Sequence, residues 1–234
     1  MAKKLFLIPN TLSEEIVLST IPSYIPETIA HLRIFLVEEG KNARRFLKKV
    51  LPQIPLQECQ FYPLNEHTSS QEIAQYLEQS QGNDMGIISE AGCPCVADPG
   101  SELVLLAHQK SWQVIPLIGA SSIMLALMAS GLNGQQFAFH GYLPHDKELR
   151  KKKIREFERV SFQEKQTQIF MEPPYRNESL MSELLSLCDP RTLLCVAVDL
   201  TAPTETVRTL KIADWKKEKI DLRKRPALFL MQKQ

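Results

Sequence analysis

The chain has 234 residues, of which 44% are hydrophobic and 24% are charged, with nine glycines and fifteen prolines. This composition is typical of folded globular proteins, so it excludes a disordered, collagen-like or low-complexity chain. No apolar run approaches the 18 or so residues of a membrane span, and the first ten residues lack the pattern of a signal peptide. We therefore expect a soluble, cytoplasmic protein with no membrane partner.

Charge is unevenly distributed along the chain. Residues 1–117 hold nine Lys and Arg against thirteen Asp and Glu, whereas residues 118–234 hold nineteen against fourteen. Because the second half carries a net positive charge, a polyanion would bind it in preference to the first half. The five cysteines are odd in number and irregularly spaced, so the sequence predicts neither a disulfide framework nor a metal site.

In the first half, short apolar runs alternate with amphipathic segments, which is typical of strand–helix–strand units. The predicted strands are Leu5–Ile8, Ile34–Val37, Phe61–Leu64, Gly86–Ser89 and Val114–Leu117, and the predicted helices are Asn42–Leu51, Ser69–Gln79 and Ser101–His108. This order predicts a doubly wound parallel sheet, whose ligands bind beyond the carboxyl ends of the strands. Pro9–Asn10, Glu38–Gly40 and Glu90–Gly100 are thus placed at the functional edge. For the same reason, Pro9, Gly92 and Gly119 should meet there.

The second half continues with helices and strands. The predicted helices are Ser121–Ser130, Lys147–Phe162 and Tyr175–Cys188, and the predicted strands are Phe137–Gly141, Gln168–Glu172, Leu193–Val198 and Ala227–Met231. The sequence contains no tandem repeat, and an α/β architecture follows for this half as well.

The segment Gly86–Ser101 combines an apolar strand with a loop of small residues and prolines. Gly92 lets backbone amides come close to a ligand, and Asp98 followed by Pro99 is a favourable helix start. Taken alone, this pattern fits a structural turn and a binding loop equally well. The glycine spacing matches neither the dinucleotide-binding nor the P-loop motif.

Several motifs match one known family in sequence and order. They are Ser89–Pro94 (SEAGCP) with Asp98–Gly100 (DPG), Val114–Ser122 (VIPLIGASS), Ala129–Leu132 (ASGL), Gly141–Pro144 (GYLP) and Met171–Arg176 (MEPPYR). These segments resemble the bacterial 16S ribosomal RNA cytidine 2′-O-ribose methyltransferases. That family belongs to the tetrapyrrole-methylase-like (class III) enzymes that use S-adenosylmethionine. The resemblance covers nearly the whole chain.

The resemblance implies two α/β domains, residues 1–117 with a doubly wound parallel sheet and residues 118–234 with a mixed sheet and helices. It also implies S-adenosylmethionine in the cleft between the domains, and usually a homodimer. Carried over by position, the cofactor contacts are Pro9, Ser89, Glu90, Ala91, Gly92, Cys93, Pro94, Ala120, Ser121, Ser122, Ala129 and Met171. No metal is implied.

Other segments depart from the family pattern. The family's Glu-Asp-Thr-Arg is replaced by Glu38–Lys41 (EEGK), and its His-Glu-His-Asn by Asn65–Thr68 (NEHT). Its Arg-Glu-Leu-Thr-Lys is replaced by Val198–Ala202 (VDLTA) and its Lys-Gly-Glu by Lys224–Pro226 (KRP). The cofactor motifs are therefore better preserved than the segments expected to contact substrate.

Methyl transfer needs placement more than acid–base chemistry, but a ribose hydroxyl is a poor nucleophile that a base would assist. The candidate catalytic residues are Glu38, Glu66 and His67, with Glu39, Glu90 and Asp98 also at the functional edge. For each of them a solvated side chain or a helix cap is the simpler interpretation. Lys147, Arg150 and Lys151 of the basic helix, together with Arg176, are the expected substrate contacts, although a solvated helix face explains the basic residues equally well.

The sequence thus predicts an S-adenosylmethionine-dependent methyltransferase that acts on a ribose 2′-hydroxyl of ribosomal RNA, free or in the small subunit. Two alternatives stay open. One is methylation of a small molecule such as a tetrapyrrole precursor, and the other is a cofactor-binding module that has lost catalysis.

Overall fold

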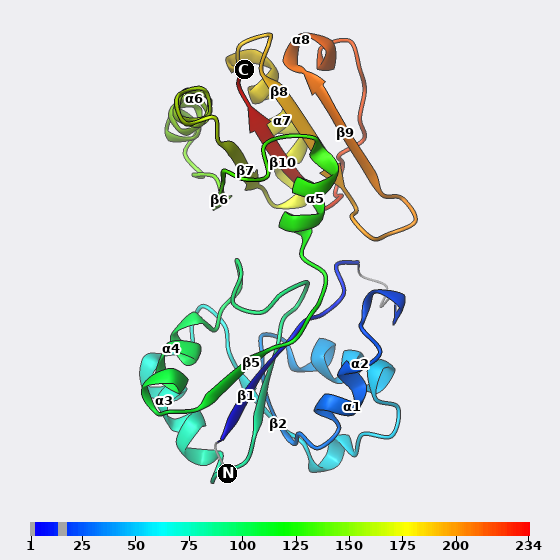
Figure 1. Cartoon of the computed structure of the whole chain (residues 1–234), viewed down its shortest axis with the longest axis vertical. Helices are drawn as coiled ribbons and strands as arrows, with labels where there is room; N and C mark the ends of the chain where they lie inside the picture. Colours follow the sequence, from blue (N-terminus) through cyan, green and yellow to red (C-terminus); the bar gives the residue numbers. More distant parts are fainter. Residues whose placement is uncertain (1–2, 14–17) are drawn as a thin grey trace. The chain divides into compact units, whose positions relative to one another are not determined.

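The computed structural model describes residues 3–13 and 18–234. The chain forms two compact units, Met1–Ser121 and Ser122–Gln234. Figure 1 shows an α/β arrangement in each unit, with helices packed on a twisted sheet. No helix within the described part of the chain is long and apolar enough to cross a membrane.

Unit 1 contains a five-stranded, entirely parallel sheet, here called sheet A. Its strands are β1 (Lys4–Ile8), β2 (Ile34–Val37), β3 (Gln60–Pro63), β4 (Met85–Ile88) and β5 (Gln113–Pro116), in the spatial order β3-β2-β4-β1-β5. The predicted parallel sheet is therefore confirmed. Because β1 and β4 lie at its centre, the segments that follow them define the middle of the carboxyl edge.

Helices cover both faces of sheet A (Figure 1). They are α1 (Ile25–Ile29), α2 (Gly40–Val50), α3 (Ser70–Gln79) and α4 (Ser101–Gln109). Side chains alternate between the faces of a strand, so Phe35 of β2 packs with α1 and α2 while Leu36 packs with α3 and α4. The predicted start of α3 is confirmed by a capping box in which the Ser69 hydroxyl accepts from the Glu72 N–H.

Unit 2 contains a mixed sheet, here called sheet B. Its strands are β6 (Phe137–Tyr142), β7 (Thr167–Met171), β8 (Leu193–Val198), β9 (Thr206–Lys211) and β10 (Ala227–Gln232), in the order β6-β7-β10-β8-β9. Only β6 and β7 pair in parallel, and the other pairs are antiparallel. The predicted mixed sheet is confirmed, and the carboxyl ends of β6 and β7 share one edge.

Four helices accompany sheet B, namely α5 (Ser122–Ser130), α6 (Lys147–Glu164), α7 (Asn177–Leu187) and α8 (Ile212–Trp215). The buried core joins Ile154 and Phe157 of α6 to Phe170 and Phe229 of the sheet, and the fully buried Trp215 completes it. Short 3-10 turns lie at Leu18–Thr20, Leu56–Glu58 and Pro174–Arg176. The elements α1, β9 and α8 were not predicted.

Candidate functional site

The loops that follow β1, β4 and β5 pack against one another at the carboxyl edge of sheet A. The backbone N–H of Asn10 donates to the Gly92 carbonyl over 2.9 Å, and the Asn10 side-chain amide donates to the Ser89 carbonyl over 2.9 Å. Gly119 lies directly against Pro9, because a Cβ added to this glycine would stand 2.2 Å from the Pro9 Cβ. The predicted meeting of these three loops is therefore confirmed.

The backbone of the Ser89–Pro94 loop is fixed around Gly92. This glycine has a φ of +70°, and a Cβ built on it would lie 3.0 Å from Leu12 Cδ2 and 3.3 Å from the Ala120 carbonyl. The Ser89 hydroxyl donates to the Gly92 carbonyl over 2.6 Å, and the Cys93 thiol lies 3.5 Å from the Ala120 carbonyl. A side chain at position 92 would therefore strain the loop even without a ligand.

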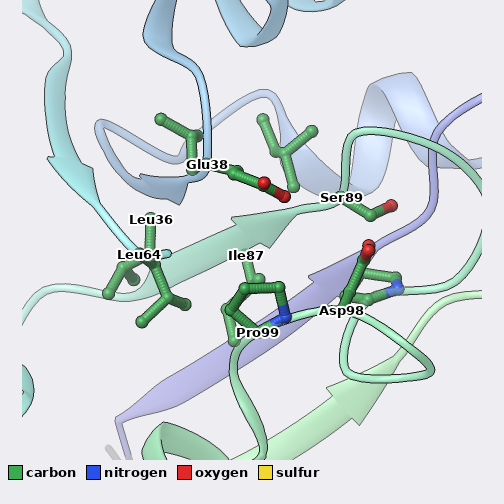
Figure 2. Close-up of a pocket in the computed structure, with 10 residues that line it drawn as sticks. Leu36, Glu38, Leu64, Ile87, Ser89, Asp98 and Pro99 are labelled. Carbon is green, nitrogen blue, oxygen red and sulfur yellow. The ribbon is translucent and has the colours of Figure 1, made fainter. Parts of the chain in front are cut away.

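A small pocket opens at this edge between the ends of β2 and β4 (Figure 2). Figure 2 shows the carboxyl groups of Glu38 and Asp98 approaching the end of β4 from different sides, next to Ser89. The remaining lining residues are apolar, namely Leu36, Val37, Leu64, Ile87, Ile88, Pro94 and Pro99. None of these described lining residues is basic, so the pocket combines two acidic groups with a mainly apolar lining.

A third carboxylate, that of Glu90, lies close to this pocket. It accepts a hydrogen bond from the Asn42 side-chain amide over 2.7 Å and one from the Glu39 backbone N–H over 3.2 Å. Glu39 in turn caps α2 by accepting from the Lys41 N–H over 3.0 Å. The Glu90 side chain therefore ties the β4 loop to the start of α2.

Burial and neighbouring negative charges raise the pKa of two acidic groups that line the pocket, Asp98 and Glu38. Burial raises the pKa of Asp98 to about 6, and the negative charges of Glu38 and Glu90 add to this shift. Partial burial is the main reason that the pKa of Glu38 is raised, and the negative charges of Glu90 and Glu66 raise it further. Oδ2 of Asp98 is buried and has no hydrogen-bond partner among the described residues. A ligand with positive charge would lower these pKa values, and a ligand with hydrogen-bond donors would give the Asp98 oxygen a partner.

Two of the three predicted catalytic residues lie outside the pocket lining. The side chains of Glu66 and His67 are 85% and 84% exposed, and they contact each other at 3.6 Å. They belong to a turn in which the His67 N–H donates to Asn65 Oδ1 over 2.9 Å. Glu66 is close enough to act on the charge of Glu38, which is the predicted catalytic residue that lines the pocket.

The predicted cofactor contacts divide between the two units. In unit 1, Ala91 is exposed on the β4 loop, and Ala120 and Ser121 are half-buried after β5. Unit 2 holds the other three, with Ser122 as the first residue of α5, Ala129 exposed near its end and Met171 as the last residue of β7.

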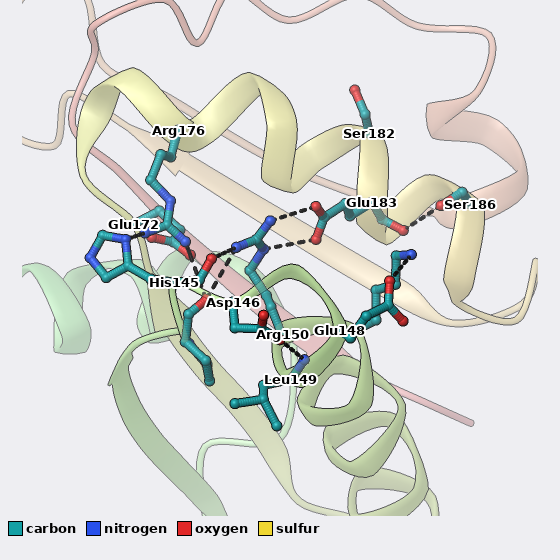
Figure 3. A network of polar contacts seen from close by, with 12 residues as sticks. His145, Asp146, Glu148, Leu149, Arg150, Glu172, Arg176, Ser182, Glu183 and Ser186 are labelled. Carbon is teal, nitrogen blue, oxygen red and sulfur yellow. Dashed lines mark hydrogen bonds and ion pairs between the residues drawn. The ribbon is translucent and has the colours of Figure 1, made fainter.

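The predicted substrate contacts differ in their accessibility. Lys147 is exposed at the start of α6, whereas the Lys151 ammonium is held by Glu148 of its own helix at 2.7 Å. Arg150 is buried, and its guanidinium donates to both carboxylate oxygens of Glu183, at 2.9 and 2.7 Å (Figure 3). The expectation of a substrate contact at Arg150 is therefore corrected, because its guanidinium is buried and bonded to Glu183.

Arg176 belongs to the same polar network (Figure 3). Its guanidinium donates to Glu172 over 3.0 Å and to the Pro144 carbonyl over 3.3 Å, and it contacts His145 Nδ1 at 2.9 Å. Burial raises the pKa of Glu172, and the charges of Arg176 and Arg150 oppose this shift. The network holds the loop after β6 against the turn after β7.

Sequence reasoning placed Asn10 at the functional edge but missed its structural contribution. Its side chain is buried and donates to the carbonyls of Ser89 and Glu90, at 2.9 and 3.2 Å, while Oδ1 accepts from the Thr11 N–H. The available signal was a polar residue directly after a buried strand, at the carboxyl edge of a parallel sheet.

Comparison of the sequence with known protein families agrees with the fold and with the preserved loops. Residues 13–215 match the family model of the Tetrapyrrole (Corrin/Porphyrin) Methylases. This match spans most of the chain, and the protein belongs to that family.

The resemblance to ribosomal RNA methyltransferases is also confirmed at the level of sequence. The chain is 28% identical over 210 residues to Ribosomal RNA small subunit methyltransferase I of Vibrio cholerae, covering 90% of this chain and 69% of that protein. The proteins of the same name from Pseudomonas aeruginosa and Haemophilus influenzae are 27% and 28% identical, over 80% and 81% of this chain. The chain spans only 64% and 65% of the length of these two relatives.

Solved structures share the fold. Diphthine synthase superposes with a TM-score of 0.67 at 14% identity, covering 99% of this chain and 90% of its own. The methyltransferase CobJ gives 0.64 at 16% identity, covering 99% and 94%. Uroporphyrin-III C-methyltransferase from Thermus thermophilus, complexed with S-adenyl homocysteine, gives 0.54 at 19% identity, covering 99% and 97%.

Proposed function

We propose that this protein is an S-adenosylmethionine-dependent methyltransferase whose cofactor binds the carboxyl edge of sheet A. The observation that carries the proposal is the acidic cluster of Glu38, Glu90 and Asp98 beside the loops after β1, β4 and β5. S-adenosylmethionine brings a sulfonium, an ammonium group and ribose hydroxyl groups. These cations and donors match the repelling carboxylates and the unpartnered Asp98 oxygen.

The loops would hold the cofactor largely through backbone and small side chains. In unit 1 the proposed contacts are Pro9, the Ser89–Pro94 loop and Ala120–Ser121. The contacts expected at Ser122, Ala129 and Met171 of unit 2 are supported by the resemblance alone. When bound, the cofactor supplies an electrophilic methyl group. The braced loops would contribute orientation, since in-line transfer depends mainly on placement of the reacting atoms.

The proposed acceptor is a ribose hydroxyl group of small-subunit ribosomal RNA. The names of the curated relatives support this substrate class. Glu38 is the proposed base for the hydroxyl proton, because its raised pKa makes it a stronger base than an ordinary carboxylate. Glu66 acts on the charge of Glu38 and contacts His67 at 3.6 Å, and the proposed role of these two exposed residues is contact with the acceptor.

The basic residues of α6 support an RNA substrate, and Lys147 is the exposed one among the contacts predicted on this helix. Lys152, Arg155 and Arg159 are exposed and lie three and seven residues apart, so they share one face of the helix. None of the three forms an ion pair within 4 Å among the described residues, and Arg159 donates to the neutral Gln163. The carboxylate of Glu156 acts on Lys152 and Arg159 from a longer distance. We propose that this face binds phosphate groups together with Lys147.

The second candidate function is methylation of a small tetrapyrrole-like molecule. The observation that favours it is the likeness of the fold to CobJ and to uroporphyrin-III C-methyltransferase. The cationic face of α6 would then have no function in binding. A cofactor-binding module without catalysis is the third option.

Transfer of a radiolabelled methyl group separates these functions. The purified protein is incubated with labelled S-adenosylmethionine and either small-subunit ribosomal RNA, intact small subunits or uroporphyrinogen. We expect label in the RNA or subunits only. Label in the tetrapyrrole alone would overturn the RNA assignment, and no transfer from a protein that binds the cofactor would favour the third option. An acceptor in the ribosome would place the protein in the cytoplasm. We also propose that the protein forms the homodimer that the resemblance implies.

A further inference from the structure

Two tyrosine side chains are exposed at the carboxyl ends of β6 and β7 in unit 2. Tyr142 is the last residue of β6 and is 60% exposed, and Tyr175 lies in the turn after β7 and is 70% exposed. The strands β6 and β7 are parallel neighbours, and Tyr142 pairs with Met171, the last residue of β7. Both aromatic rings therefore belong to the same edge of sheet B.

The turn that carries Tyr175 is held in place before any ligand binds. Pro173 and Pro174 restrict the backbone in front of it, and the Arg176 N–H donates to the Pro173 carbonyl over 2.8 Å. The Arg176 guanidinium is anchored on the buried carboxylate of Glu172. An exposed ring on such a turn loses little conformational entropy when it contacts a partner.

The loop after Tyr142 is fixed by the same polar network (Figure 3). The Pro144 carbonyl accepts from Arg176 over 3.3 Å and from Arg150 over 3.1 Å. The His145 carbonyl accepts from Arg150 over 3.0 Å. The backbones on both sides of the edge are thus joined through two guanidinium groups.

Positive charge flanks the two tyrosines. The Asn177 side-chain amide donates to the Arg225 carbonyl over 2.7 Å, which brings the segment before Arg225 to the start of α7. That segment contains Arg223 and Lys224, which are exposed and form no ion pair among the described residues. Lys147 is exposed at the start of α6, after the loop that follows β6.

We propose that Tyr142 and Tyr175 form a stacking platform for unpaired nucleobases of single-stranded RNA. Aromatic rings stack on any unpaired base, while cations beside them bind the phosphates. Exposed aromatic rings with exposed cations on the neighbouring segments fit this polyanion better than an apolar protein surface. The inference rests on the proposed function in RNA methylation, and it identifies residues that hold the acceptor strand in unit 2.

The test is fluorescence anisotropy of a labelled single-stranded RNA from the small subunit, with a duplex of the same sequence beside it. The variants are Tyr142→Ala, Tyr175→Ala and Tyr175→Phe, and Leu105→Ala is the control because it removes an exposed apolar side chain of α4 in unit 1. We expect each tyrosine-to-alanine change to weaken binding about tenfold or more. The slope of affinity against salt should stay unchanged, and Tyr175→Phe should bind as the wild type does.

The outcomes separate this inference from the proposed function. If the wild type binds and methylates RNA while both alanine variants bind as tightly as it does, the platform is wrong and the function stands. If the wild type binds no RNA, both the RNA substrate and the platform are overturned. If the alanine variants instead change the oligomeric state in size-exclusion chromatography, the tyrosines belong to an interface between copies, which also overturns the platform. Thermal unfolding and cofactor titration confirm that each variant is folded.

Discussion

The side-chain amide of Asn10, just beyond β1, donates to the carbonyl of Ser89, just beyond β4, over a distance of 2.9 Å. These residues are 79 positions apart in sequence, yet both belong to the middle of the carboxyl edge of sheet A. The bond fixes the two loops to which we assign the cofactor. This buried amide is one of several contacts that set the geometry of the proposed site.

Asn10→Ala removes this amide and leaves the carbonyls of Ser89 and Glu90 without their donor. We expect the free energy of unfolding to fall by about 1–3 kcal/mol, and the affinity for S-adenosylmethionine to fall as well. Denaturant unfolding and calorimetric titration measure the two effects. Asn83→Ala is the matched control, because Asn83 donates to the Ser80 carbonyl over 2.9 Å in a turn before β4. Equal loss of cofactor affinity in both variants would show that Asn10 is not specific to the site.

Asp98→Asn tests the acidic cluster through the pH dependence of stability. Because the folded-state pKa of about 6 lies above the ordinary value of 3.8, the folded protein binds the proton more tightly than the unfolded chain. The contribution of Asp98 to stability therefore decreases as pH rises from about 4 to about 6, and stays lower above that range. We expect Asp98→Asn to raise the free energy of unfolding by about 1 kcal/mol at pH 8, after allowance for solvent screening. At pH 4 the variant should be as stable as the wild type.

The measurement for Asp98→Asn is the unfolding midpoint between pH 4 and pH 8 in the absence of ligand. Asp84→Asn is a useful control, since Asp84 accepts from the Lys4 N–H over 2.9 Å and pairs with His31 at the opposite edge of the sheet. That variant should lose stability. A stability loss for Asp98→Asn at pH 8 would contradict the repulsive cluster.

The cationic face of α6 is tested by the salt dependence of RNA binding. Replacing Lys152, Arg155 and Arg159 with Gln should flatten the slope of log affinity against log salt by about two units, because each phosphate contact on a single strand contributes about 0.7. The control is Lys151→Gln with Lys153→Gln, whose ammonium groups are paired with Glu148 and Glu156 of the same helix. An unchanged slope in the triple variant would make this face solvated surface.

The buried Arg150–Glu183 pair makes a prediction about stability alone. Arg150→Met leaves the Glu183 carboxylate buried without its partner, so we expect a loss of about 3–5 kcal/mol in the free energy of unfolding. Adding Glu183→Leu should restore most of the loss, because no uncompensated charge remains. Denaturant titration compares the wild type with both variants. If the single variant is as stable as the wild type, Arg150 is not the structural residue that we describe.

The sequence predicts the parts of the fold that have strong periodicity. The three central strands of sheet A, β1, β2 and β4, are largely or wholly buried runs rich in apolar residues, and α3 begins with a recognisable cap at Ser69. In contrast, β9 (TVRTLK) carries two cations and is half exposed, and it forms because β8 offers it a pairing edge. α1 is only five residues long and contains Pro26, so its local signal is weak. Tertiary contacts decide both elements.

The candidate site was predicted in its backbone more than in its side chains. The meeting of Pro9, Gly92 and Gly119 follows from parallel topology alone. The buried ion pair of Arg150 does not follow from topology, because a cation in a basic run is expected to be exposed to solvent unless the facing Glu183 of α7 is known. Likewise, the carboxyl group of Asp98 is set apart from the exposed one of Glu66 by burial and by the neighbouring charges of Glu38 and Glu90, neither of which can be read from the sequence.

A crystal structure with S-adenosylhomocysteine bound tests the central claim most directly. The account expects this product at the carboxyl edge of sheet A, in contact with the Ser89–Pro94 loop and the segment after β5, and near the carboxyl groups of Glu38 and Asp98. Electron density for the product at the opposite edge of the sheet, beside His31 and Asp84, would contradict the claim. So would a fully formed product site that leaves both loops without contact.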